Sequence, residues 1–139
     1  MFASGTYFLQ LLVLVVCHGL TVADIARYFL VKRSMSWSQS QEFCQKYFVD
    51  LTVISTENEY HCLQTATSGE RVSFWIGLQR NEDNSWTWVD GEENVHYEKW
   101  RENKVGDCGS FEAMLMKPNK MLSRFCEEPH AFVCQGIDI

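Results

Sequence analysis

The spacing of apolar and polar positions predicts a strand and then a helix at the start of the main domain. The stretch "RYFLVKRSMSW" from residue 27 opens with a β-prone apolar run. Ser36 and Gln39 then match a capping box, which marks the beginning of a helix. Apolar side chains recur on one face of that helix at Trp37, Cys44 and Tyr47 or Phe48. We expect a helix over about residues 37–48, with Cys44 pointing into the core.

A second strand and helix follow directly. The run "DLTVIS" over residues 50–55 is short and β-branched, as strands often are. Thr56 and Glu59 repeat the helix start signal, and Gly69 supplies a helix end. The inward face of this helix would carry Cys62 or Leu63 together with Ala66.

Beyond residue 71 the pattern becomes that of a sheet. "VSFWIGL" is a continuous apolar run, typical of a strand buried on both faces, and "SWTWVDG" alternates towards a turn. "SFEAMLM", "KPNK" and "MLSRF" together indicate a second hairpin, and "HAFVC" is the last strand. The order of elements predicts an α+β fold, with two helices beside short antiparallel sheets.

The N-terminal segment is interpreted separately. Residues 7–20 form an uncharged apolar run with the length of a signal-peptide core, shorter than a membrane-spanning helix. We predict a signal peptide over residues 1–23, with cleavage after Gly19 or Ala23, and a single domain over residues 24–139. The product would be secreted and extracellular, without membrane insertion of the mature chain. A signal anchor is the alternative, because no Lys or Arg precedes the apolar run.

Charge and residue spacing exclude several classes of function. The net charge of −6 argues against nucleic acid or an anionic membrane as partner. There is no Cys-x-x-Cys, the four histidines show no ligand spacing, and no Ser-His-Asp order can be placed. We therefore expect a protein that is not an enzyme.

Removal of the signal peptide would change the number of cysteines available for disulfides. Cys17 would leave with it, and five cysteines would remain in an oxidising compartment: Cys44, Cys62, Cys108, Cys126 and Cys134. Five is an odd number, so we expect two bridges and one spare cysteine. The residues alone leave both the pairing and the identity of the spare open.

Several of these stretches, taken in their order, resemble a C-type lectin-like domain. They are "SMSWSQSQEFC", "DLTVISTENEYHCL", "FWIGL", "WTWVDG", "HYEKW" and the ending "AFVC", which together cover essentially the whole mature chain. The resemblance implies the C-type lectin-like fold and the disulfides Cys44–Cys134 and Cys108–Cys126. Cys62 is then the spare, interpreted as a buried free thiol. An intermolecular disulfide through Cys62, which would give a dimer, is the alternative.

The same resemblance raises the question of calcium. Sugar-binding members of the family hold one calcium ion through a Glu-Pro-Asn or Gln-Pro-Asp tripeptide and an Asn-Asp pair that follows a Trp. Here the loop from Arg101 to Asp107 is short and contains no proline. The positions of the pair before Cys126 lack a carboxylate, because they carry Met121, Leu122 and Ser123. Calcium needs six to eight oxygen ligands, so we expect no cofactor.

We therefore predict a carbohydrate-binding-type module that recognises a protein or a glycan without calcium. Candidate contacts on its loop face are Arg101, Glu102, Asn103, Lys104, Asn81 and Asp83. The alternative is a weak calcium-dependent carbohydrate-binding lectin, whose metal ligands would be Glu102, Asn103, Asp107 and Glu112. A further alternative is that the chain is part of a larger multi-domain receptor.

Overall fold

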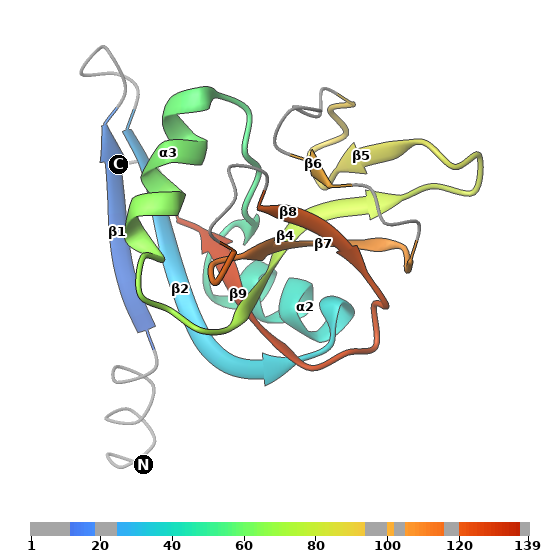
Figure 1. The fold of residues 1–139 in the computed structure, drawn as a ribbon, viewed down its shortest axis with the longest axis horizontal. Helices are drawn as coiled ribbons and strands as arrows, with labels where there is room; N and C mark the ends of the chain where they lie inside the picture. The colour runs from blue at the N-terminus through green and yellow to red at the C-terminus, as the bar shows by residue number, and fades with distance from the viewer. Residues whose placement is uncertain (1–11, 19–24, 94–99, 102–104, 116–119, 137–139) are drawn as a thin grey trace.

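The computed structural model describes residues 12–18, 25–93, 100–101, 105–115 and 120–136, and of residues 12–18, 25–26 and 100–101 the backbone only (Figure 1). Two helices and nine strands lie within these residues. In chain order they are β1 (Leu12–His18), β2 (Ile25–Met35), α2 (Trp37–Tyr47), β3 (Asp50–Leu51), α3 (Glu57–Ala66), β4 (Ser73–Arg80), β5 (Trp86–Trp88), β6 (Trp100–Arg101), β7 (Cys108–Glu112), β8 (Met121–Arg124) and β9 (His130–Gln135).

Both helices begin where their capping signals predict. At α2 the Ser36 hydroxyl accepts a hydrogen bond from the Gln39 backbone N–H at 3.3 Å. The Gln39 side chain accepts one in return from the Ser36 N–H at 3.1 Å, which completes the capping box. At α3 the Thr56 hydroxyl caps the N–H of Glu59 at 3.1 Å. The expected helices are confirmed, each within a residue or two of its predicted bounds.

The strands form one mixed sheet, in the order β1-β2-β9-β4-β7-β8-β6, with β3 paired to β9 and β5 to β4. The pairs β4·β9 and β6·β8 are parallel and the others are antiparallel. The predicted α+β fold with two helices is confirmed, and the predicted antiparallel pairing holds for every strand pair except β4·β9 and β6·β8, which make the sheet mixed. The last strand returns to the centre of the sheet, between β2 and β4, and runs in the same direction as β4.

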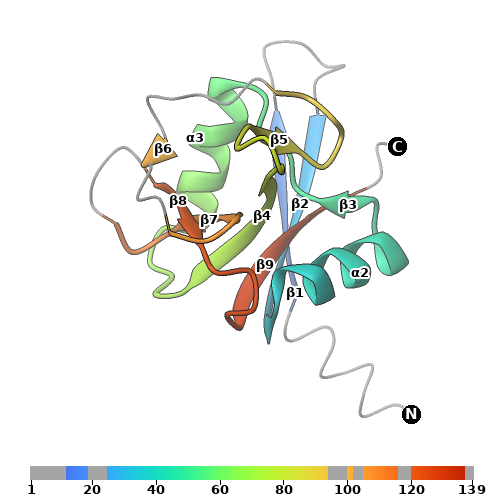
Figure 2. The same ribbon diagram turned by 90° about the vertical axis from the view of Figure 1, so that its right-hand side faces the viewer.

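The two helices cover opposite faces of the central strands β4 and β9 (Figure 2). Alternate residues of β4 therefore enter two different cores: Phe74 packs in the core that contains α3 residues, and Trp75 in the core that contains α2 residues. Both side chains are fully buried. The Trp75 indole N–H also donates to the Met35 carbonyl at 2.9 Å. The prediction that β4 is buried on both faces is confirmed.

Residues 12–18, predicted as the apolar core of a signal peptide, form strand β1. Its pairing with β2 is antiparallel and runs from Leu12 opposite Val31 to His18 opposite Ile25. Figure 1 shows α3 beside this pair of strands. Removal of the segment by cleavage stays a prediction. In the part of the chain described, no helix has the length and apolar character needed to cross a membrane.

The predicted disulfides Cys44–Cys134 and Cys108–Cys126 are both present. The prediction of a free thiol at Cys62 is wrong, because Cys62 is disulfide-bonded. That prediction removed Cys17 together with a signal and so counted five cysteines. The whole chain contains six, an even number.

We expect the two described disulfides to contribute unequally to stability. The Cys44–Cys134 bond spans 90 residues and the Cys108–Cys126 bond spans 18. A disulfide restricts the conformations of the unfolded chain, and more so when it closes a longer loop. Replacing both cysteines by serines should therefore lower the unfolding free energy by about 4.5 kcal/mol for the long bridge and by about 3 kcal/mol for the short one. Urea unfolding of the two double-serine variants measures both values. A larger loss for the short bridge would contradict this account.

Candidate functional site

The loop between β6 and β7 is the region in which the sequence places most candidate contacts. Glu102, Asn103 and Lys104 lie outside the described residues, and Arg101 is described by its backbone alone. Arg101 stands opposite Leu122 in the parallel pair β6·β8. The structure thus places the start of this loop beside β8, the strand at whose positions calcium-binding family members would carry the Asn-Asp pair.

The end of the loop is fixed to β4 through Arg80. The Arg80 side chain donates to the Gly106 carbonyl at 2.7 Å, and its Nε lies 3.2 Å from Oδ1 of Asp107. Its guanidinium carbon also lies 5.0 Å from the centre of the Trp86 ring. Gly106 has a φ of +76°, and a Cβ there would lie 2.0 Å from the backbone of Arg124. Only glycine fits this close approach of loop and strand.

The neighbouring turn between β4 and β5 carries Asn81 and Asp83, two further predicted contacts. The Ser85 hydroxyl donates to Asp83 at 2.6 Å and accepts from the Asn81 amide at 3.0 Å. The hydrogen bonds from Ser85 lower the pKa of the exposed Asp83 carboxyl. Because Arg80 links this turn to the loop end at Asp107, the structure brings two of the predicted contact regions together.

Glu112 occupies a very different environment, inside the sheet. Its side chain is 7% exposed and forms an ion pair with Arg124. One carboxylate oxygen accepts from the Ser73 hydroxyl at 2.9 Å, and the other from the Ser110 hydroxyl at 2.8 Å. Burial raises the pKa of Glu112, but the hydrogen bonds from Arg124 and the serines outweigh it and hold the pKa below its ordinary value of 4.5.

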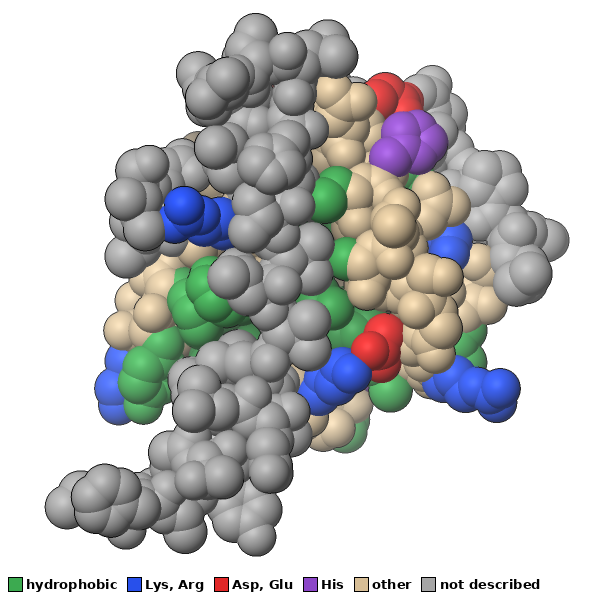
Figure 3. Space-filling model, turned by 90° about the vertical axis from the view of Figure 1, so that its left-hand side faces the viewer, with side chains coloured by type: hydrophobic (Ala, Val, Ile, Leu, Met, Phe, Trp, Pro, Cys, Tyr) green, Lys and Arg blue, Asp and Glu red, His purple; other side chains and the backbone are tan. Residues whose placement is uncertain are grey.

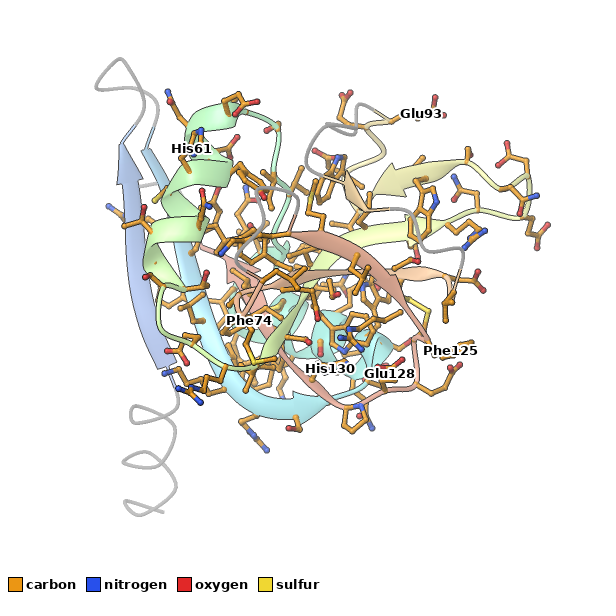
Figure 4. All side chains as sticks on the ribbon, in the orientation of Figure 1. His61, Phe74, Glu93, Phe125, Glu128 and His130 are labelled. Atoms are coloured by element: carbon orange, nitrogen blue, oxygen red, sulfur yellow. A yellow bond between two sulfur atoms is a disulfide. The ribbon has the colours of Figure 1, made fainter. Side chains whose placement is uncertain are left out.

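The charge network continues from Arg124 to the surface. Nη1 of Arg124 lies 3.1 Å from a Glu128 oxygen, and the His130 ring nitrogen Nε2 lies 2.8 Å from the same oxygen. Figure 4 shows Glu128 and His130 next to one another. The His130 ring also meets the Trp75 ring edge-on, with centroids 5.0 Å apart. Arg124 therefore neutralises two carboxylates that would otherwise be partly buried without a counter-charge.

Asp107 and Glu112 do not meet around a common ion. They are five residues apart along an extended strand, a distance of roughly 16 Å at about 3.3 Å per residue. Calcium ligands lie about 2.3–2.6 Å from the ion, so one ion cannot bind both carboxylates. Met121 and Ser123 on β8 are buried and carry no carboxylate. Among the described residues, no three His, Cys, Asp or Glu side chains form a group able to hold a metal.

Sequence reasoning missed Arg80 and Arg124, the two cations that organise this region. Arg80 ends an apolar strand, and Arg124 lies in the alternating run "MLSRF". Their partners come from segments 26 and 12 residues away. A correct strand register would have been needed to find them.

Comparison with known proteins identifies relatives over most of the chain. The family model described as "Lectin C-type domain" matches residues 33–136. The bovine secretory phospholipase A2 receptor is 31% identical over 118 residues, which cover 80% of this chain but 8% of the receptor. Rat natural killer cells antigen CD94 is 29% identical over 116 residues, which cover 79% of this chain and 59% of that protein. The chain thus spans a small part of the receptor and less than two thirds of CD94.

Solved structures show the same fold. Human lithostathine superimposes with a TM-score of 0.70 and 21% identity, covering 86% of this chain and 88% of that one. The C-type lectin domain of murine dendritic cell inhibitory receptor 2 was solved in complex with an N-glycan. It superimposes with a TM-score of 0.68 and 22% identity, covering 81% of this chain and 91% of that one.

The Glu112–Arg124 pair predicts a dependence of stability on acid. Because the pKa of Glu112 is lowered on folding, its ionisation stabilises the fold above about pH 4.5, and this contribution is lost as pH falls through the folded-state pKa. Glu112→Gln should lower the unfolding free energy at pH 7 by about 3 kcal/mol. We expect the difference in unfolding free energy between this variant and wild type to be smaller at pH 3 than at pH 7. Urea unfolding at the two pH values measures it.

The matched control for this prediction is Glu127→Gln, which removes an exposed carboxylate near the same network. We expect it to change stability by less than about 0.5 kcal/mol at either pH. A Glu112→Gln effect that is equally large at pH 7 and pH 3 would show that the charge of Glu112 is not the cause.

Proposed function

This chain belongs to the C-type lectin domain family, and from that premise we propose that it recognises a protein or a glycan without calcium. The family consists of binding domains and not of enzymes. Murine dendritic cell inhibitory receptor 2, which has a similar fold, was solved with an N-glycan, so a glycan is one of the ligand classes to test.

The environment of Glu112 is the observation that carries the proposal. This carboxylate would be one of the oxygen ligands in the calcium-dependent alternative, yet it already accepts hydrogen bonds from Arg124, Ser73 and Ser110. A calcium ion would have to displace the guanidinium from a buried site, at the cost of leaving Arg124 without its main partner. Calcium-independent recognition needs no such exchange.

The proposed binding surface combines the turn that carries Asn81 and Asp83 with the loop that ends at Asp107. Support comes from the Arg80 bridge between the two segments and from the internal hydrogen bonds of the turn. A surface held in place before binding loses less conformational entropy on association. Within the loop, the proposed contacts stay those of the sequence: Arg101, Glu102, Asn103 and Lys104.

The location of the protein follows in part from the same evidence. Disulfide-bonded C-type lectin domains are consistent with an extracellular or cell-surface location. We further propose that the apolar N-terminal segment directs secretion. The mass of the chain recovered from the medium of expressing cells would reveal cleavage after Gly19 or Ala23.

The test of calcium independence is a thermal melt of the full chain in calcium and in chelator, followed by glycan and protein arrays under both conditions. A calcium site filled at 100 times its Kd would stabilise the fold by about 2.7 kcal/mol. We expect no rise in melting temperature with calcium, and equal array signals in both conditions.

The double variant Glu102→Ala with Asn103→Ala tests the binding surface. It should weaken any array signal and leave the melting temperature unchanged, whereas Glu127→Gln should change neither. A calcium-dependent rise in melting temperature, together with glycan binding abolished by chelator, would establish the calcium-dependent alternative instead.

A further inference from the structure

The structure contains a cavity of about 210 Å³ whose lining the sections above do not use as a ligand site. Its walls come from β3 with the residues around it, the start of α3, the turn after β5 and the end of β9. Of the proposed contacts whose side chains the structure describes, neither Asn81 nor Asp83 lines it.

One part of the cavity wall is aliphatic. Val49, Val53 and Val89 contribute to it. Val53 is buried, whereas Val49 is 51% exposed. The cavity thus combines a buried apolar side chain, Val53, with one that is accessible to a partner, Val49.

The remaining wall carries three carboxylates, from Asp50, Glu59 and Asp90. Glu59 is held in place, because its two oxygens accept hydrogen bonds from the Tyr28 hydroxyl at 3.0 Å and the Ser55 hydroxyl at 2.9 Å. No Lys or Arg is among the described residues that line the cavity. Across the described residues, no ion pair with Lys or Arg is formed by any of these three carboxylates.

Four acidic side chains elsewhere in the described part of the domain have a Lys or Arg partner. Glu112 and Glu128 pair with Arg124, Asp107 pairs with Arg80, and Glu70 pairs with Lys32. Figure 3 shows basic and acidic side chains in contact on the face that carries β1. Among the described residues, the three carboxylates of the cavity wall thus have no Lys or Arg as counter-charge, and the whole chain carries a net charge of −6.

The chemistry of the lining fits a long cationic side chain. Lys and Arg carry an aliphatic stem that packs against apolar walls and a charged head that pairs with carboxylates. Arginine fits several carboxylates best, because its planar guanidinium donates in more than one direction. The volume is smaller than the roughly 300–1,000 Å³ typical of small-molecule pockets, which favours a single side chain over a sugar ring. We propose that this cavity receives an arginine side chain of a protein partner, as a second contact beyond the proposed loop surface.

The test uses two short peptides that differ in one group, acetyl-Gly-Arg-Gly-amide and its citrulline analogue, which is neutral and nearly the same shape. Each is titrated into the ¹⁵N-labelled full chain and followed by amide chemical shifts. The arginine peptide should give saturable shifts at residues 49–55 and 89–90. We expect the citrulline peptide to bind at least about tenfold more weakly, since it lacks the charge that the carboxylates attract.

The variant Asp50→Asn with Asp90→Asn should weaken arginine-peptide binding by about tenfold, as expected for the loss of two charge contacts. Asparagine keeps the acceptor oxygen that Asp50 offers to the Leu51 N–H. Glu127→Gln, which lies outside the cavity, is the matched control and should bind like wild type. Asp90→Asn alone serves as the second variant, because Asp90 is exposed and its change leaves the core untouched.

Three results would overturn the proposal. The first is equal binding of the two peptides, and the second is a set of shifts scattered over the whole surface. The third is saturable shifts of the same amides with calcium chloride alone that block the arginine peptide, which would make the cavity a metal site. None of these results bears on the loop surface, whose test uses different residues and ligands.

Discussion

The disulfide between Cys44 and Cys134 joins α2 to β9, a central strand of the sheet. Both cysteines are fully buried, and Cys134 lies on β9, which pairs with β2, β3 and β4. The bond therefore ties the first helix to the last strand across 90 residues. The later strands are built onto this framework, since β7 pairs with both β4 and β8. The turn and the loop that we propose as the binding surface connect such strands.

Elements that depend on neighbouring residues could be predicted from the sequence. The two capping signals at Ser36 and Thr56 gave correct helix starts, since both act over three residues. The direction of β9 could not be predicted in this way. Its place between β2 and β4 is set by burial of Phe132 and Val133 against two different cores, which is a property of the assembled sheet. The free thiol expected at Cys62 was wrong for a different reason, because the expectation counted five cysteines, without Cys17, whereas the whole chain contains six.

The candidate site shows the same division between local and distant effects. The turn at Asn81 and Asp83 was visible as a polar segment between strands, and its hydrogen bonds join residues at most a few positions apart. Glu112 was visible only as a carboxylate that could serve a metal. Its actual role comes from Arg124, which reaches it across a hairpin whose register the sequence did not specify. A titratable residue type in a motif region is therefore weak evidence for ligation until its partners are known.

The placement of charge argues for a division between carboxylates that stabilise the fold and carboxylates that are available for contact. Glu112 is buried and would be costly without Arg124, so its pairing is a condition of folding. Asp50 and Asp90 are more accessible, and solvent reduces the cost of leaving them without a cation. Selection for stability alone gives no reason to place them with Glu59 around an apolar cavity, where they repel one another. A partner that supplies the missing positive charge would remove that repulsion, and the gain would then appear as binding free energy.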